Sequence, residues 1–256
     1  MTKIEFIQGD CLQAMNLLEP QSIDCIVTSP PYNIGVKYEI YDDTLDREAY
    51  LVWTSRWLEK AKVVLKEQGS LFLNIGCKPT NPWGPFEVAF EARKHFKLQN
   101  TIYWVKSISI ENRSHGHYKP INSERFVNDC VEMILHLTKT GDVAVNRTAI
   151  GVPFMDKTNI TRGTRGKNGD LRCRGNAWFV PYETTTTSKS HPAAFPVKLA
   201  EMCFKLHGVQ EGMKTLDPFS GTGSSAVASK NLKADHIGIE LSNKDIEEAK
   251  KRLLWA

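Results

Sequence analysis

A pentapeptide with two successive prolines, Thr28-Ser29-Pro30-Pro31-Tyr32, follows an apolar run that predicts a β-strand. Ligands of open α/β sheets bind beyond the carboxyl ends of strands, so this turn is a candidate place for chemistry. The prolines fix φ and lack N–H groups, which leaves a stiff turn whose carbonyls can accept hydrogen bonds. A planar ligand ring that carries an exocyclic amino group could stack on Tyr32 and donate its amino hydrogens to Ser29 and the Pro30 carbonyl. The amino nitrogen would then become nucleophilic. The alternative is an ordinary turn with Tyr32 in the core.

A second segment, Leu216 to Gly223 (LDPFSGTG), predicts a strand-to-helix turn. Its two glycines allow close approach of a ligand, and the following helix presents its N-terminal amides. Glu240 closes the next predicted strand, where a carboxylate can bind both hydroxyls of a ribose, and Asp217 can face a cationic or amino group. Ala226 replaces the third glycine of the dinucleotide fingerprint. This combination favours S-adenosylmethionine over a pyrophosphate cofactor, whereas each feature alone could be a tight turn or a solvated strand end.

Together, the Thr28–Tyr32 turn and the Asp-Pro-Phe-Ser-Gly-Thr-Gly loop resemble the motifs of DNA amino-methyltransferases, which methylate cytosine N4 or adenine N6. Their order, with the catalytic turn first, is similar to that of the circularly permuted beta class. The resemblance covers nearly the whole chain outside a central insert. It implies an α/β, Rossmann-like S-adenosylmethionine-dependent methyltransferase fold, with a mainly parallel twisted sheet, helices on both faces and a target-recognition insert. It also implies direct attack by the amino nitrogen of a flipped base, without a covalent enzyme intermediate.

The resemblance assigns roles to single positions. It implies a catalytic turn made of Ser29, Pro30, Pro31 and Tyr32. The implied cofactor-binding residues are Asp10, Thr28, Phe195, Asp217, Phe219, Ser220, Gly221, Thr222, Gly223 and Glu240. Asp10, which would meet the adenine amino group, could instead be a helix N-cap, and Phe195, which would close over the methionine, could instead be ordinary core. Serine in the first place of the turn favours cytosine N4, because adenine N6 enzymes more often have aspartate there.

The elements that must position these residues follow from hydrophobic periodicity, which alternates between strand and helix patterns in the manner of strands joined by crossover helices. Strands are predicted at 4–7, 25–28, 70–75, 100–105, 130–137, 215–217 and 236–241, and helices at 11–18, 46–67, 86–95, 197–206, 224–232 and 243–254. Gly69 is predicted to end the second helix. Periodicity fades from about 107, apart from the strand at Cys130. We therefore predict a catalytic half at 1–106, a target-recognition insert at about 107–190 that includes a core strand near 130–138, and a cofactor-binding half at 191–256.

Positive charge is concentrated in the predicted insert. The segment 157–174 carries a net charge of +5, so the rest of the chain is near −1 within a total of +4. Such a local excess indicates a surface for a polyanion, and glycines between the basic residues suit a loop that orders on phosphate, although a solvated loop is the alternative. The predicted DNA-binding residues are Arg113, Lys119, Arg125, Arg162, Arg165, Lys167, Arg172 and Arg174, because arginine commonly reads guanine edges.

The composition, with 41% hydrophobic and 24% charged residues, is that of an ordinary globular protein. No apolar run approaches the roughly 18 residues of a membrane span, and no signal-peptide block is found, so we expect a soluble protein in the cytoplasm. Six cysteines without a C-x-x-C pair predict reduced thiols and no metal site. The expected partner is double-stranded DNA. A cognate restriction endonuclease as a separate chain is possible, and the sequence does not decide between monomer and dimer.

Two other functions are alternatives to this prediction. Enzymes that methylate protein glutamine or RNA use similar Pro-Pro-Tyr turns, but usually with asparagine first and with the cofactor loop ahead of the turn. A DNA-binding regulator on an inactive methyltransferase scaffold is the second alternative. The intact Ser29, Tyr32 and Gly221 argue against it.

Overall fold

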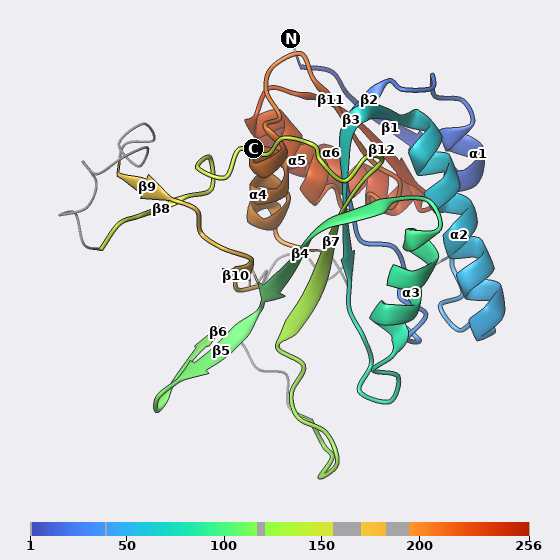
Figure 1. The fold of residues 1–256 in the computed structure, drawn as a ribbon. Coiled ribbons are helices and arrows are strands. Elements are labelled where there is room, and N and C mark those ends of the chain that lie inside the picture. Colours follow the sequence, from blue (N-terminus) through green and yellow to red (C-terminus); the bar gives the residue numbers. More distant parts are fainter. Residues whose placement is uncertain (1, 39, 117–120, 156–169, 183–194, 256) are drawn as a thin grey trace.

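The computed structural model describes residues 2–38, 40–116, 121–155, 170–182 and 195–255. Its centre is an eight-stranded sheet in the order β1-β12-β11-β2-β3-β7-β4-β10 (Figure 1). The strands are β1 (Ile4–Gln8), β12 (Asp235–Glu240), β11 (Lys214–Asp217), β2 (Ile23–Thr28), β3 (Leu65–Ile75), β7 (Val131–Thr138), β4 (Lys97–Val105) and β10 (Ala177–Phe179). Within this sheet, β7 runs antiparallel to its neighbours β3 and β4, and the other pairs are parallel. The predicted mainly parallel sheet is confirmed.

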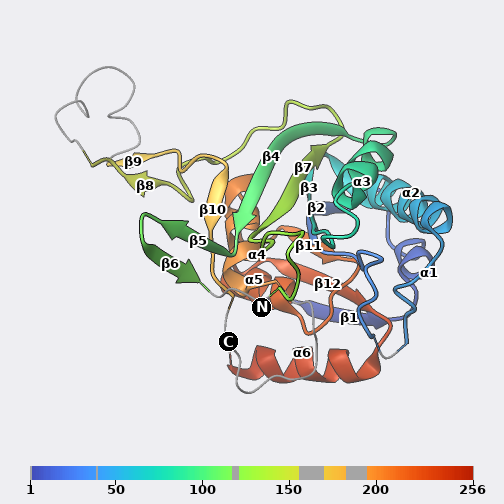
Figure 2. The same ribbon diagram turned by 90° about the horizontal axis from the view of Figure 1, so that it is seen from below.

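Helices cover both faces of the sheet (Figures 1 and 2). The first face carries α1 (Cys11–Met15), α2 (Arg47–Val64) and α3 (Gly84–Arg93), and the second carries α4 (Val197–His207), α5 (Ser224–Asn231) and α6 (Asn243–Trp255). Side chains alternate along each strand, so Ile26 joins the core under α2 while Cys25 and Val27 join the core under α4. The prediction of helices on both faces is confirmed. None of the described helices is both long and apolar enough to cross a membrane.

The long helix α2 shows how the sequence sets an element. The Asp46 side chain caps its start by accepting hydrogen bonds from the amides of Glu48 and Ala49, an arrangement that stabilises a helix by about 1 kcal/mol. Tyr50, Trp57 and other buried side chains at three- and four-residue steps then hold one face of the helix against the sheet. This helix positions the catalytic turn, because the Tyr50 hydroxyl donates a hydrogen bond to the Pro31 carbonyl at 2.9 Å.

The prediction that Gly69 ends this helix is wrong. The helix ends at Val64, and Leu65 already pairs with Ile23 of β2. Gly69 lies inside β3, where a Cβ atom would come within 2.7 Å of the Leu65 side chain and 3.0 Å of the Asp24 carbonyl oxygen. The glycine therefore permits close contact beside the register irregularity of β2 and β3. The first helix is also shorter than predicted, since it ends at Met15.

The region predicted as the insert contains short strands that periodicity did not reveal. A hairpin of β5 (Ser107–Ile110) and β6 (Arg113–Gly116) and a ribbon of β8 (Val152–Pro153) and β9 (Leu171–Arg172) project from the body (Figures 1 and 2). They were missed because most of their residues are exposed and show no alternation. The same region also supplies β7 and β10 to the main sheet. The boundaries of a target-recognition insert remain a prediction.

Candidate active site

The catalytic turn and the glycine loop lie side by side because β2 and β11 are neighbours in the sheet. The chain leaves β2 toward α2 on one face and leaves β11 toward α5 on the other, which opens a crevice at the carboxyl ends of the strands. Thr28 Oγ1 donates to Asp217 Oδ1 at 2.6 Å and so joins the two strand ends. A cavity of about 680 Å³ is lined by residues of both segments. The two motifs therefore meet at one cavity.

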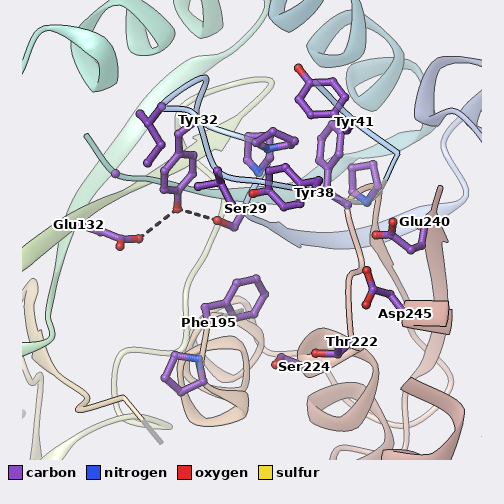
Figure 3. Close-up of a pocket in the computed structure, with 18 of the residues that line it drawn as sticks. Ser29, Tyr32, Tyr38, Tyr41, Glu132, Phe195, Thr222, Ser224, Glu240 and Asp245 are labelled. Atoms are coloured by element: carbon purple, nitrogen blue, oxygen red, sulfur yellow. Dashed lines mark hydrogen bonds between the residues drawn. The ribbon is translucent and has the colours of Figure 1, made fainter. Parts of the chain in front are cut away.

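The cavity has two polar ends and an aromatic middle (Figure 3). Ser29, Tyr32 and Glu132 stand at one side of the close-up, and the carboxylates of Glu240 and Asp245 stand at the other. Aromatic rings lie on the wall as well, namely Tyr38, Tyr41, Trp53, Phe195 and Phe219. Trp53 and Trp57 hold Phe219 by ring contacts with centroid separations of 5.5 and 5.3 Å.

A hydrogen-bond network fixes the catalytic turn. The Tyr32 hydroxyl donates to Glu132 Oε2 at 3.0 Å and lies 2.6 Å from Ser29 Oγ. Asn74 Nδ2 donates to Glu132 Oε2 at 2.7 Å and contacts the Tyr32 hydroxyl at 2.8 Å. A carboxylate only accepts, so the hydrogen of Tyr32 points to Glu132 and the Ser29 hydroxyl donates to the Tyr32 oxygen. Ser29 Oγ also accepts from Asn74 Nδ2 at 3.5 Å, which leaves one lone pair of this oxygen to accept a hydrogen bond from a ligand.

The electrostatics keep Tyr32 neutral. Burial raises the pKa of its hydroxyl well above the ordinary value, and the neighbouring Glu132 carboxylate raises it further. Tyr32 therefore acts as a donor and an aromatic surface at neutral pH, and not as a base. Its ring has space because residue 76 is glycine, where a Cβ would lie 2.8 Å from the Tyr32 ring.

Asp217 turns into the protein interior. It is 1% exposed and accepts hydrogen bonds from Thr28 Oγ1, Ser225 Oγ and the Phe219 amide, at 2.6, 2.7 and 3.0 Å. Burial raises its pKa to about 6, although these donors oppose the shift. The carboxylate links β2, β11 and α5, because it lies at the end of β11 and its partners Thr28 and Ser225 lie on β2 and α5. The described residues that line the cavity do not include Asp217, so the structure does not show it facing a cationic group.

Glu240 orders the glycine loop from the neighbouring strand. Its Oε2 accepts from the Gly221 amide at 2.8 Å, and its Oε1 accepts from the Ser242 amide at 3.0 Å. Each oxygen keeps a lone pair for a further donor, and the residue lines the cavity. Gly223 is required by packing, since its φ is +79° and a Cβ there would lie 2.8 Å from the Ala249 Cβ.

The predicted site residues divide between the cavity wall and the structure behind it. Those on the wall are Asp10, Ser29, Pro30, Pro31, Tyr32, Phe195, Phe219, Thr222 and Glu240. Thr28, Asp217, Ser220, Gly221 and Gly223 lie behind it among the described residues. Asp10 also caps α1 by accepting from the amides of Leu12 and Gln13, as the alternative interpretation predicted. The roles of these residues in binding and catalysis remain predictions.

Sequence reasoning missed several wall residues, including Tyr38, Tyr41, Trp53, Lys106, Glu132, Tyr182 and Asp245. Two of them carried a usable signal. Glu132 is a single acid inside an otherwise mostly apolar strand, and burial of a lone carboxylate without a partner is costly. Lys106 directly follows the strand β4, at the edge where ligands bind in such sheets.

Two of the predicted DNA-binding residues lie on the projecting ribbons. Arg113 on β6 and Arg172 on β9 are exposed on the two projecting ribbons. The Arg125 guanidinium lies 4.9 Å from the ring centroid of Phe126, and Arg174 Nε donates to the Ile150 carbonyl. Four others, namely Lys119, Arg162, Arg165 and Lys167, lie outside the described residues.

A family model described as DNA methylase, for N6- and N4-specific enzymes, matches residues 23–251. The chain belongs to this DNA methylase family. Type II methyltransferase M.ScaI of Streptomyces caespitosus is 26% identical over 262 residues, which cover 96% of this chain and 79% of that protein. The resemblance to amino-methyltransferases is confirmed, and the chain is an S-adenosylmethionine-dependent DNA amino-methyltransferase.

Solved structures share the fold of this DNA methylase. The cytosine-N4-specific PvuII DNA methyltransferase has a TM-score of 0.76 at 17% identity, with 98% of this chain and 86% of that chain covered. The M1.HpyAVI–SAM complex has a TM-score of 0.60 at 18% identity, with 98% of each chain covered. The predicted Rossmann-like methyltransferase fold is confirmed.

The cavity of this DNA methylase fits S-adenosylmethionine by its size and its donor set. Its volume is within the roughly 300–1,000 Å³ of small-molecule sites. Carboxylates at one end suit hydroxyl and amino groups, and aromatic rings suit a planar purine. Among the described residues, no cluster of three or more His, Cys, Asp or Glu side chains could hold a metal ion.

Proposed function

We propose that this DNA methylase is a cytoplasmic enzyme that methylates the N4 amino group of a flipped cytosine at a specific sequence in double-stranded DNA. Adenine N6 is the alternative target. The single observation that carries the proposal is the shared cavity, in which the Ser29–Tyr32 turn stands opposite the carboxylate end. S-adenosylmethionine bound there would supply an activated methyl group.

The catalytic turn would act on the amino group of the base. Ser29 Oγ, whose hydrogen is directed to Tyr32, and the Pro30 carbonyl would accept the two amino hydrogens. These two hydrogen bonds would draw the lone pair of the amino nitrogen out of conjugation with the ring. The amino nitrogen would thereby become more nucleophilic. The Tyr32 ring would stack on the base and offset part of the few kcal/mol that base flipping costs. Positioning and electrostatics account for the remaining catalysis.

The opposite end would bind the cofactor. Glu240 has one lone pair on each oxygen beyond its two backbone contacts, which supports binding of the ribose hydroxyls. Asp10 is proposed to meet the adenine amino group, and Phe195 and Phe219 are proposed to enclose the methionine part. Asp217 and Thr28 would contribute indirectly, because their hydrogen bonds hold the strand ends in place, and the Ser220 amide holds the loop by donating to the Ile239 carbonyl.

Serine in the first place of the turn supports cytosine. A neutral hydroxyl that donates to Tyr32 offers a lone pair to an amino group, and adenine N6 enzymes more often carry aspartate at this place. Relatives such as M.ScaI are named Type II methyltransferases, which supports a role beside a separate restriction endonuclease.

Nucleoside analysis tests the function directly. DNA from cells that express the protein is digested and analysed by mass spectrometry, with Tyr32→Ala as the inactive control. N4-methyldeoxycytidine in the wild-type sample alone is the expected result, and modified-base sequencing then gives the recognition site. N6-methyldeoxyadenosine would establish the alternative target. Absence of both, in cells with soluble protein that binds S-adenosylmethionine, would favour the inactive DNA-binding regulator.

A further inference from the structure

A lysine stands at the catalytic end of the cavity without a role in the function proposed so far. Lys106 directly follows β4 and lines the cavity, and its side chain is only 11% exposed. Its ammonium lies 3.1 Å from Glu132 Oε1 and 3.7 Å from Asp129 Oδ2. The Tyr182 ring centroid is 5.9 Å away. Its backbone amide donates to the Cys130 carbonyl, which fixes the residue beside β7.

The hydrogen-bond capacity of this lysine is not exhausted by these partners. An ammonium has three N–H donors. Glu132 accepts a hydrogen bond from one of them, and the Asp129 carboxylate, at 3.7 Å, attracts a second as an ion pair. The third N–H is available for a ligand, because Lys106 lines the cavity. A buried lysine that served only as a structural ion pair would not need to reach the cavity.

The lysine is linked to the catalytic serine through a single carboxylate. Glu132 Oε1 accepts from Lys106, whereas Glu132 Oε2 accepts from the Tyr32 hydroxyl, which contacts Ser29 Oγ at 2.6 Å. Figure 3 shows Ser29, Tyr32 and Glu132 next to one another at the cavity. When the base donates to Ser29 the amino hydrogen that lies nearer its unprotonated ring nitrogen, the ring edge with that nitrogen faces the Lys106 side of the network.

That edge carries an acceptor in both candidate bases. A ring nitrogen without hydrogen lies next to the amino carbon, at N3 of cytosine and at N1 of adenine. This atom is engaged in base pairing inside the duplex and becomes free only after flipping. The corresponding ring nitrogen of thymine and guanine carries a hydrogen and would confront the ammonium with a second donor.

We propose that Lys106 recognises the flipped base by donating its third N–H to the ring nitrogen beside the amino group. The inference rests on the proposed methylation of an amino base and names a specificity-determining residue for it. Glu132 and Asp129 hold the ammonium in place, and thymine and guanine are rejected because two donors would face each other.

The test replaces one atom of the target base. Duplexes carry the normal base or its deaza analogue, 3-deazacytosine or 1-deazaadenine according to the base that is methylated, and single-turnover methylation rates are measured. Wild type is expected to lose about 10- to 100-fold on the deaza duplex, as for a lost hydrogen bond to a charged group. Lys106→Met is expected to methylate the normal duplex more slowly than wild type does. Its rate should fall by less than about a further threefold on the deaza duplex.

A matched control separates recognition from charge. Lys78→Met removes an exposed lysine that is not among the described cavity-lining residues, and it should retain the wild-type deaza penalty. The altered reactivity of the amino group in the analogue affects wild type and every variant equally. The ratio of the rates on the normal and the deaza duplex, compared between wild type and variants, therefore reports the contact of Lys106 with the ring nitrogen. Because Lys106→Met leaves Glu132 without its cation, the double variant Lys106→Met/Glu132→Gln is measured as well.

The outcomes distinguish the two proposals. A full deaza penalty in both Lys106 variants would overturn the inference and leave the proposed function intact. A penalty that disappears in both, while Lys78→Met retains it, supports the inference. Failure of wild type to methylate any unmodified duplex would overturn the proposed function and the inference with it.

Discussion

The side-chain hydrogen bonds of Glu240 and Asp10 at the cofactor end and of Tyr32 at the catalytic end differ in range. At the cofactor end, Glu240 bonds to amides only 2 and 19 residues away, and Asp10 caps a helix that begins at the next residue. At the catalytic end, Tyr32 bonds to Glu132 across 100 residues and to Asn74 across 42. Loops that follow neighbouring strands make the first end, and the order of strands across the sheet makes the second.

This difference has a consequence for how each end responds to change. A substitution at the cofactor end disturbs one loop, so its effect should remain local to ligand affinity. A substitution at the catalytic end disturbs a network shared by β3, β7 and the turn after β2, so its effect should reach the chemical step.

The largest expected effect is that of Tyr32→Ala at the catalytic end. Loss of the ring and of the contact that orients Ser29 should lower kcat by about 10²- to 10³-fold, the scale found for removal of a positioned electrostatic group. The dissociation constant for S-adenosylmethionine should change little, which calorimetry measures. Tyr32→Phe keeps the ring and should retain more activity. An equal loss of cofactor affinity would contradict the division into two ends.

Asp217 should show a stability effect where the two ends meet. Its folded pKa of about 6 exceeds the ordinary value of 3.8, so the folded protein binds the proton more tightly. Its contribution is fully present below pH 4 and is lost as pH rises through about 6, which corresponds to roughly 2–3 kcal/mol of unfolding free energy.

Denaturant unfolding of wild type and Asp217→Asn from pH 4 to pH 7 measures this effect. The free energy of wild type relative to the variant should fall over that range, because only the carboxylate titrates. A constant difference between the two proteins would show that Asp217 does not hold a raised pKa in the folded state.

Glu240→Ala tests whether a substitution at the cofactor end affects only the affinity for S-adenosylmethionine. The variant leaves the Gly221 and Ser242 amides without their acceptor and removes the proposed ribose contact. We expect about tenfold weaker S-adenosylmethionine binding, with kcat at saturation nearly kept. Glu247→Ala, a half-exposed residue of α6, is the control and should bind normally. A large fall in kcat at saturating cofactor would show that the two ends are coupled.

The smallest effects are expected on the projecting ribbons. Arg113→Ala and Arg172→Ala should each weaken DNA binding modestly and reduce the magnitude of its salt slope by about one. Fluorescence anisotropy with a labelled duplex at several salt concentrations measures both quantities. Arg93→Ala, an exposed residue of α3, should leave the slope unchanged. If both ribbon variants keep the wild-type slope, the DNA surface lies elsewhere.

The sequence alone determined the alternation of helices and strands, both motifs and the placement of Glu240 at a strand end. These features depend on residues close along the chain: the stiffness of Pro30-Pro31, the backbone freedom of the glycine loop and the burial pattern of each element. It also indicated helix capping by Asp10 as an alternative, which the structure shows. It misassigned Gly69, since the pattern did not reveal the contact of that residue with Leu65 and Asp24.

Only the tertiary structure decided which side chains share the cavity. Asp217 turns inward because the hydroxyls of Thr28 and Ser225 meet it there, and no local pattern fixes that meeting. Lys106 and Glu132 reach the catalytic turn because β7 enters the sheet between β3 and β4. The reason is that hydrogen bonds between distant residues depend on which strands are neighbours in the sheet. The strand order in turn depends on the packing of the whole chain.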